Sequence, residues 1–209
     1  MKALLIVLAE LISIAVWKKD MPTNPAATSG SSIRYSPGPT FRIQYPPQLA
    51  GQDGTSFDFP TKGSSVGYVV KTAPKLSLGQ TISIKFSIDG SGTLIPTDSD
   101  PPARVRLYFQ RAGDNGSGAG PYQHYRYWGH PDVVLGAARD YEVSVELKPE
   151  NWSDVFGAYG NQHPQAFADA VANAGAIGFT FGGMFAGHGI YVKQGTGSVR
   201  FVLKEYSIK

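Results

Sequence analysis

Apolar and polar residues alternate along several short segments of the chain. The clearest is residues 80–88, where every second position from Ile82 to Ile88 is Ile or Phe, and residues 104–111 and 141–148 repeat the pattern. A period of two places successive side chains on opposite faces of a β-strand. The pattern therefore predicts half-buried strands whose apolar faces form a common core.

Nine segments have the composition of strands and are separated by turn residues. They are 41–45, 64–72, 80–88, 104–111, 122–128, 141–148, 177–181, 189–193 and 198–208. The 25 Gly and 15 Pro residues suit many short strands joined by tight turns. We expect residues 40–209 to form one all-β domain, an antiparallel jelly-roll β-sandwich of eight or nine strands.

One short inserted helix is expected near the C-terminal end of this domain. Residues 164–174 are rich in Ala, begin with Pro and are followed by Gly175. Phe167 and Val171 are four residues apart, which puts them on one edge of a helix. We expect that edge to pack over one end of the sandwich.

The first 20 residues carry an apolar run, from residue 3 to residue 17, interrupted by Glu10 and Ser13. The run is short for a membrane span, which needs about 20 residues, and has the length of a signal peptide. Export is the favoured interpretation, with an uncleaved N-terminal anchor as the alternative. Residues 21–39 are mostly small or polar and predict a flexible linker. The expected location is secreted or cell envelope, with membrane contact through the N-terminal segment alone.

Charge and cysteine content exclude some classes of function. The net charge is +3, and the 19 basic residues are scattered without a cluster, so nucleic-acid binding is not expected. The chain has no Cys, which excludes disulfides and thiolate metal sites.

The most unusual stretch is RAGDNGSGAGPYQHYRYW, residues 111–128, in which a Gly-rich loop leads into aromatic and basic residues. If residues 122–128 form a strand, alternation puts Tyr122, His124, Arg126 and Trp128 on one face and Gln123, Tyr125 and Tyr127 on the other. Aromatic rings stack on the C–H surface of sugars, and charged groups pair with sugar hydroxyls. A carbohydrate, including a polysaccharide, is the expected partner, although Tyr and Trp are also common structural residues of strands.

A second Gly-rich stretch, FTFGGMFAGHGIY, places His188 between Gly187 and Gly189, where it could reach a cleft or serve as a structural hydrogen-bonding group. The residues that we expect to contact the ligand are Arg111, Tyr122, His124, Tyr125, Arg126, Trp128 and His188.

A structural calcium site is a weaker interpretation of the loops, and no other cofactor is expected. Asp114, Asn115 and Ser117 supply oxygens at short intervals, and Asp98 and Asp100 flank a second turn. The EF-hand spacing is missing, so ordinary hairpin loops are the favoured interpretation.

Motifs of catalysis are scarce: the chain has no GxSxG and no HExxH, and it has four His. Non-catalytic glycan binding is therefore the expected function. A polysaccharide lyase is an alternative, because proton abstraction beside a uronate carboxylate needs a base and a cation, and Gln123, His124, Tyr125 and Arg126 include these types. A structural subunit of an envelope or filament, which would associate with copies of itself, is a third.

Three blocks of sequence carry a resemblance to a known group. They are YFQRAGDNGSGAGPYQHYRYW, VELKPENWSDVFG and IGFTFGGMFAGHGIYVKQGTGSVRFVLKEYSI. Over residues 66–209 the chain resembles uncharacterised bacterial exported proteins, and its final GTGSVRFVLKEYSI is similar to the last strand of galactose-binding-like and carbohydrate-binding-module jelly rolls. The resemblance implies a fold and supplies no catalytic residues.

Overall fold

The computed structural model describes residues 40–45 and 49–209. The expected signal peptide or anchor and the expected linker lie outside the described residues. The strands are β1 (Arg42–Tyr45), β2 (Ser56–Asp58), β3 (Tyr68–Thr72), β4 (Thr81–Gly90), β5 (Leu94–Pro96), β6 (Arg104–Arg111), β7 (Arg126–Gly129), β8 (Val133–Val134), β9 (Arg139–Glu146), β10 (Trp152–Ser153), β11 (Ala174–Gly182), β12 (Ile190–Val192) and β13 (Val199–Ile208). The helices are the α-helix α2 (Pro164–Ala172) and the 3₁₀-helices η2 (Gly120–His124), η3 (Pro149–Asn151) and η4 (Gly160–Gln162).

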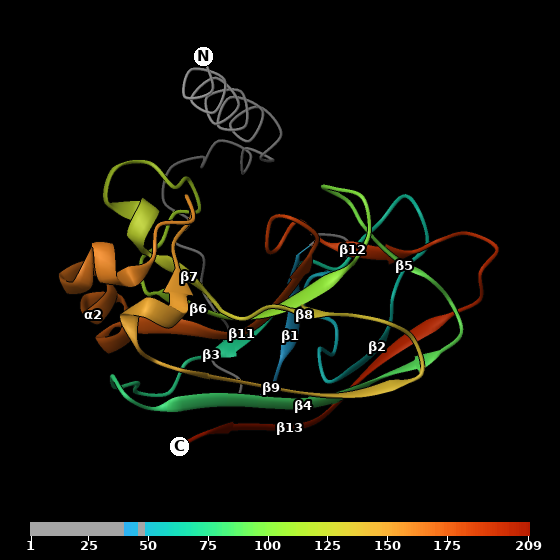
Figure 1. Cartoon of the computed structure of the whole chain (residues 1–209), viewed down its shortest axis with the longest axis horizontal. Helices are drawn as coiled ribbons and strands as arrows, with labels where there is room; N and C mark the ends of the chain where they lie inside the picture. Colours follow the sequence, from blue (N-terminus) through green and yellow to red (C-terminus); the bar gives the residue numbers. More distant parts are fainter. Residues whose placement is uncertain (1–39, 46–48) are drawn as a thin grey trace, which may run out of the picture. The chain divides into compact units, whose positions relative to one another are not determined.

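Two antiparallel sheets form the two layers of the domain (Figure 1). The seven-stranded sheet has the order β1-β3-β11-β6-β7-β10, with β8 paired to β6, and the four-stranded sheet has the order β2-β13-β4-β9. Strands β5 and β12 pair with each other in a separate ladder. The predicted antiparallel, all-β architecture is confirmed at this level.

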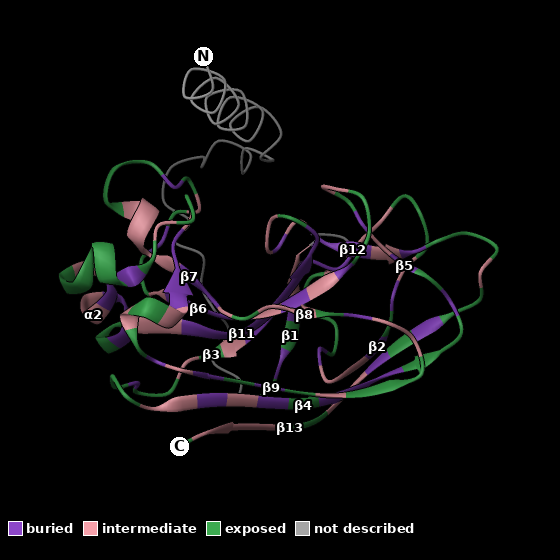
Figure 2. Cartoon of the chain, in the orientation of Figure 1, coloured by how far each residue is buried: buried purple, intermediate pink, exposed green. Residues whose placement is uncertain are grey.

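The core lies between the two sheets and contains the side chains that the alternation pattern placed there. Ile82, Ile84, Phe86 and Ile88 of β4 all have an exposed fraction of 0%. Inward-facing residues of the seven-stranded sheet, among them Phe179, join the same apolar cluster. Figure 2 shows buried residues concentrated along the strands and exposed residues along the loops.

The helix predicted at residues 164–174 is present but ends at Ala172, and it lies at one end of the sheets (Figure 1). Phe167 is fully buried, and its ring centroid lies 5.8 Å from that of Phe109 and 5.0 Å from that of Tyr127. The expected apolar edge, Phe167 and Val171, is buried. The helix therefore closes one end of the core.

The expectation of one strand over residues 122–128 is wrong. Residues 120–124 form η2, and β7 begins only at Arg126. Pro121 stands at the start of η2, where its fixed φ suits a helical turn and its missing N–H prevents a ladder hydrogen bond. Tyr122 and His124 therefore do not share a strand face with Arg126. The short strands β2, β5, β8 and β10 were not predicted, since two or three residues show no alternation.

No helix in the described part of the chain has both the length and the apolar character that crossing a membrane requires.

Candidate functional site

The seven-stranded sheet has a second, outward-facing surface with its own chemistry. Val105, Leu107 and Phe109 of β6 point into the core, so the alternate residues of β6 point away from it. Residues directly opposite in neighbouring strands share a face, which extends this surface to three further strands. We call it the outer face; it comprises Tyr68 and Val70 of β3, Ala176, Gly178 and Thr180 of β11, Arg104, Arg106, Tyr108 and Gln110 of β6, and Arg126 and Trp128 of β7.

Three aromatic rings cross the middle of the outer face. The ring centroids of Tyr68 and Tyr108 are 5.2 Å apart, and those of Tyr108 and Trp128 are 5.5 Å apart. Tyr68 of β3 stands opposite Thr180 of β11, and Tyr108 of β6 stands opposite Gly178, so the two rings meet diagonally across β11. A Cβ atom at Gly178 would collide with the carbonyl oxygen of Val69.

A buried ion pair lies beside the rings. Arg126 Nε is 2.9 Å from Asp114 Oδ2, and the exposed fractions of the two side chains are 11% and 0%. Arg126 Nε makes no hydrogen bond, so its contact with Asp114 is an ion pair. Gln110 Nε2 donates a hydrogen bond of 2.8 Å to the same carboxylate oxygen, and Tyr108 donates to Gln110 Oε1 at 3.1 Å.

The charge of the Arg126–Asp114 ion pair also reaches Tyr68, on strand β3 of the outer face. Burial raises the pKa of Tyr68 to about 12, and the positive charge of Arg126 opposes that rise. The Arg126 side chain of β7 therefore acts on a hydroxyl of β3, across β6 and β11. Rings, amide and guanidinium form one continuous surface.

A second charged group lies toward the other end of β6. Arg104 and Arg106 both donate to Asp132 Oδ2, each at 2.9 Å. Burial lowers the pKa of Arg106, and the carboxylate of Asp132 opposes this effect. Burial also lowers the pKa of His130, with a further lowering by the charge of Arg106. His130 Nε2 lies 2.8 Å from Ser153 Oγ, so an imidazole with a lowered pKa stands within the field of the Arg106 cation.

Several polar atoms of the outer face are buried without a hydrogen-bond partner among the described residues. They are Arg106 Nε, Arg126 Nε, which is ion-paired with Asp114, Arg126 Nη2, Trp128 Nε1 and Thr180 Oγ1. The Arg and Trp atoms can only donate, and a hydroxyl can donate or accept. A buried donor without an acceptor costs about 1–3 kcal/mol. The outer face therefore has a surplus of donors and a shortage of acceptors.

The rings of the outer face do not form an open platform. Tyr108 and Trp128 have exposed fractions of 1% and 7%. Val155 and Ala186 pack against them, and Ala186 belongs to the Gly-rich stretch from Gly182 to Gly189. This loop is part of what covers the rings.

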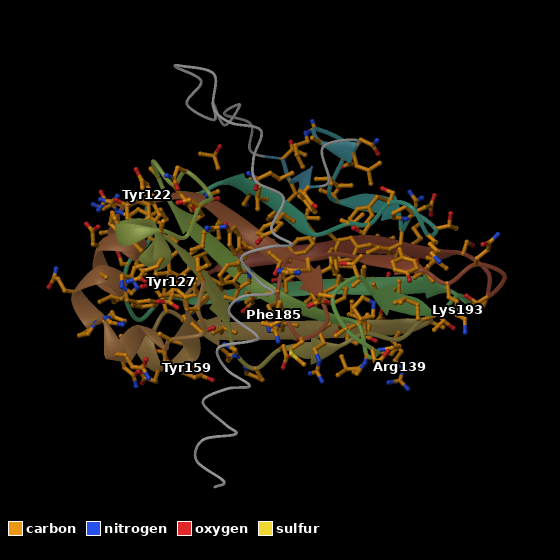
Figure 3. The ribbon with its side chains drawn as sticks, turned by 90° about the horizontal axis from the view of Figure 1, so that it is seen from above. Tyr122, Tyr127, Arg139, Tyr159, Phe185 and Lys193 are labelled. Carbon is orange, nitrogen blue, oxygen red and sulfur yellow. The ribbon has the colours of Figure 1, made fainter. Side chains whose placement is uncertain are left out.

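The structure separates the predicted ligand residues into several groups. Arg126 and Trp128 lie on the outer face. Arg111 lies over the Tyr125 ring at 4.3 Å, and the rings of Tyr125 and Tyr122 are 5.0 Å apart. Arg111 Nε is also 2.7 Å from Asp169 of α2. Figure 3 shows Tyr122 near one end of the domain.

His124 belongs to another group, which organises a turn. Its Nδ1 is 2.8 Å from Asp154 Oδ2, and Gln123 Nε2 is 2.8 Å from its Nε2. Both ring nitrogens of His124 are therefore engaged within the chain. Asp154 Oδ1 accepts from the backbone N–H of Phe156 and Ala158. This contact fixes residues 154–158 beside the outer face.

His188 lies in the Gly-rich loop at the border of the outer face. Its ring centroid is 5.5 Å from that of Phe185, which Figure 3 shows nearer the middle of the domain. Burial lowers the pKa of His188, and the charge of Asp98 opposes this effect. Asp98 also accepts from the backbone N–H of Gly183 and Phe185, at 2.9 and 2.6 Å. The loop thus folds around the Asp98 carboxylate.

The oxygens of the possible calcium loop have partners within the chain. Asp114 Oδ1 accepts from the Gly116 N–H, Asn115 Oδ1 from the Ser117 N–H, and Ser117 Oγ from the Ala119 N–H. Within residues 40–45 and 49–209, no three His, Asp or Glu side chains gather in a way that could hold a metal ion.

Sequence reasoning missed Tyr68, Arg106, His130 and Thr180. A signal existed for Arg106: the apolar residues of 104–111 were assigned to the core, and the residues between them must then face outward. Tyr68, His130 and Thr180 gave no local signal, because their role depends on which strands are neighbours.

Comparison of the chain with protein-family models, with curated proteins and with solved structures finds no match. The resemblance to bacterial exported proteins and to galactose-binding-like modules therefore stays a prediction.

Proposed function

We propose that this protein binds a glycan, without catalysis, on the outer face of its seven-stranded sheet, and that its two sheets have jelly-roll connectivity. The observation that carries the proposal is the gathering of Arg106, Arg126, Trp128 and Thr180 around three aromatic rings, with polar atoms that lack partners among the described residues. Sugars present many hydroxyl oxygens that accept hydrogen bonds, and C–H surfaces that pack on rings.

In this proposal the ligand reaches the donors when the Gly-rich loop moves. Ala186 packs against the ring cluster, and Gly187 and Gly189 have φ angles of +83° and +98°. Such angles are accessible to Gly at no steric cost. The partly exposed rings of Tyr122 and Tyr125, with Arg111 beside them, extend the binding surface at one end.

The proposal also places the protein outside the cell or in the cell envelope. Its support is the apolar segment of residues 1–20, which has the length of a signal peptide. Mass spectrometry of the mature N-terminus tests this part: a new start after residue 16 supports export of a free protein, and an intact Met1 contradicts a free exported protein and favours an uncleaved anchor or self-assembly.

A glycan array that compares two tryptophan variants tests the binding site. Trp128→Phe removes the Nε1–H donor from the outer face and keeps a ring. Trp152→Phe is the matched control, because Trp152 is fully buried and its Nε1 donates to the Glu146 carbonyl oxygen at 2.8 Å. Loss of one hydrogen bond to the ligand corresponds to a weakening of about 2- to 13-fold.

We expect Trp128→Phe to weaken glycan binding and Trp152→Phe to leave it unchanged, with both measured below the melting temperature of either variant. If the unaltered protein binds no glycan on a broad array, the proposal is wrong. If both variants bind with full strength, glycan binding lies elsewhere than on the outer face.

A second candidate function, a polysaccharide lyase, is favoured by one observation. His130 has a lowered pKa beside the cation Arg106, so a neutral base adjoins a group that could neutralise a uronate carboxylate. In such a reaction the imidazole takes the C5 proton, the electron pair forms a C4–C5 double bond, and the C4–O bond breaks as the leaving oxygen gains a proton. Incubation with acidic polysaccharides separates the candidates, because ultraviolet absorbance of unsaturated products appears only with a lyase.

A further inference from the structure

We infer that the glycan is acidic and that Arg106 and Thr180 together bind its carboxylate. This inference rests on the proposed function and adds the chemical class of the ligand. Its basis is a pair of buried polar atoms on adjacent strands, Arg106 Nε and Thr180 Oγ1, that have no hydrogen-bond partner among the described residues. The carboxylate of Asp132, which Arg104 and Arg106 share, lies beside them.

The two groups are brought together by the register of the sheet. Thr180 of β11 stands directly opposite Arg106 of β6, so both side chains lie on the outer face at the same level. Thr180 has an exposed fraction of 1% and the Arg106 side chain 12%. Thr180 Oγ1 and Arg106 Nε have no hydrogen-bond partner among the described residues. A carboxylate, which only accepts hydrogen bonds, could take one from each.

Two guanidinium groups, of Arg104 and Arg106, stand with two carboxylates, of Asp132 and Asp98, so a free donor and not an excess of positive charge favours an anion here. Asp132 uses one oxygen, Oδ2, for both Arg104 and Arg106, so a single carboxylate serves two guanidinium groups. Asp98 also acts on Arg106 through its charge, but its oxygens accept from the backbone N–H groups of Gly183 and Phe185. The Arg106 Nε–H therefore keeps its donor capacity for a ligand. His130, whose pKa is lowered by burial, adds no competing positive charge at neutral pH.

A second cationic donor on the same face supports an acidic polymer over a single acid. Arg126 stands opposite Gln110, four residues along β6 from Arg106, and four strand residues span about 13 Å. Arg126 Nη2 is a further guanidinium atom of the face that is buried without a hydrogen-bond partner among the described residues, although the same side chain pairs with Asp114 and acts on Tyr68. Two anchoring points along one line suit a chain that carries acid groups on several of its sugars.

The test measures the affinity of the protein for one polymer in two forms, a polyuronate and the same polymer after reduction of its carboxyl groups to alcohols. Inorganic sulfate is added in a third arm as a competitor, because a free oxyanion shares the chemistry of a sugar acid. We expect the polyuronate to bind about tenfold or more tightly than its reduced form, as one charged hydrogen bond implies. Sulfate alone should compete weakly.

Two variants test whether Arg106 and Thr180 cause the preference for the acidic polymer. Thr180→Val keeps the shape and removes a hydroxyl that the fold does not use, so folding should be unaffected. In Arg106→Gln, Asp132 keeps its contact with Arg104. Both should reduce the preference for the acidic polymer, Arg106→Gln about tenfold, and leave binding of the reduced polymer unchanged. The control is Arg139→Gln, an exposed arginine on β9 of the other sheet, which Figure 3 shows on the opposite side of the domain from Tyr122.

The possible failures are distinguishable. If the protein binds both polymers equally, the acidic class is wrong and glycan binding stands. If it binds neither the polymers nor any other glycan, both the inference and the proposed function fall. If both variants keep the full preference, the carboxylate is not held by Arg106 and Thr180. If sulfate abolishes binding at low concentration, the site is one for free oxyanions and the inference is wrong.

Discussion

The buried ion pair between Arg126 and Asp114 allows a quantitative prediction. Asp114 has no exposed side-chain area and Arg126 has 11%, so the substitution Arg126→Met leaves a buried carboxylate without its cation. Breaking a buried pair in this way costs about 3–5 kcal/mol. The carboxylate keeps hydrogen bonds from Gln110 Nε2 and the Gly116 N–H, which places the cost at the lower end, about 3 kcal/mol. For a domain of this size that corresponds to a fall in melting temperature of about 6–12 °C.

A double-mutant cycle isolates the pair from the packing of the arginine stem. Arg126→Met/Asp114→Asn removes both charges, and its free energy of unfolding should lie at least about 1 kcal/mol above that of Arg126→Met alone. The assay is urea denaturation followed by tryptophan fluorescence and circular dichroism. Lys204→Met and Asp140→Asn form the control cycle, because that pair joins exposed side chains at 2.6 Å and should couple by less than about 1 kcal/mol.

The reasoning is refuted if Arg126→Met costs less than about 1 kcal/mol, or if the double variant is no more stable than Arg126→Met. Either result would mean that Asp114 does not depend on Arg126 in the folded protein. The polar part of the outer face would then not be held by this pair.

The remaining predictions concern pH, one tyrosine and the helix. Burial lowers the pKa of His130 and His188 below 6.5, so the folded state binds fewer protons than the unfolded state. The melting temperature should therefore fall as the pH drops from about 7 to 5. Replacing both His by Gln should reduce this fall. The pKa of Tyr68 is raised to about 12. In an alkaline ultraviolet titration, Tyr68→Phe should therefore remove a tyrosine that titrates near pH 12. If the variant instead loses a tyrosine that titrates near pH 10, the prediction is wrong. Phe167 is fully buried between rings; Phe167→Ala should lower the free energy of unfolding by about 3–5 kcal/mol in urea denaturation, and a cost below about 1 kcal/mol would mean that α2 does not close the core.

Particular segments explain which predictions succeeded. Residues 80–88 and 104–111 show clear alternation, and both form strands with their apolar residues in the core. The Ala-rich segment with Pro164 at its start forms the helix, two residues shorter than expected. Residues 122–128 were misassigned because Tyr and Trp are common in strands, whereas Pro121 and the preceding glycines favour a tight helical turn.

The candidate site was only partly accessible to sequence reasoning. Arg126 and Trp128 were expected in it, and they lie on the outer face. His124, Arg111 and His188 were expected to contact the same ligand, but each has a separate set of neighbours: Asp154 for His124, Asp169 for Arg111 and the Gly-rich loop for His188. Spacing along a chain says which residues are near in sequence, and the contacts of His124 and Arg111 join residues 30 or more positions apart.

The amino-acid sequence by itself determined the local features of this protein: which short segments are extended, which of their side chains are buried, and where the helix begins. Those features depend on the period of apolar residues and on turn chemistry, both of which act over a few neighbouring positions. Only the tertiary structure decided that β3, β11, β6 and β7 are neighbours. Strand pairing is a long-range choice, and it alone placed Thr180 opposite Arg106 and brought the rings of Tyr68 and Tyr108 together across β11.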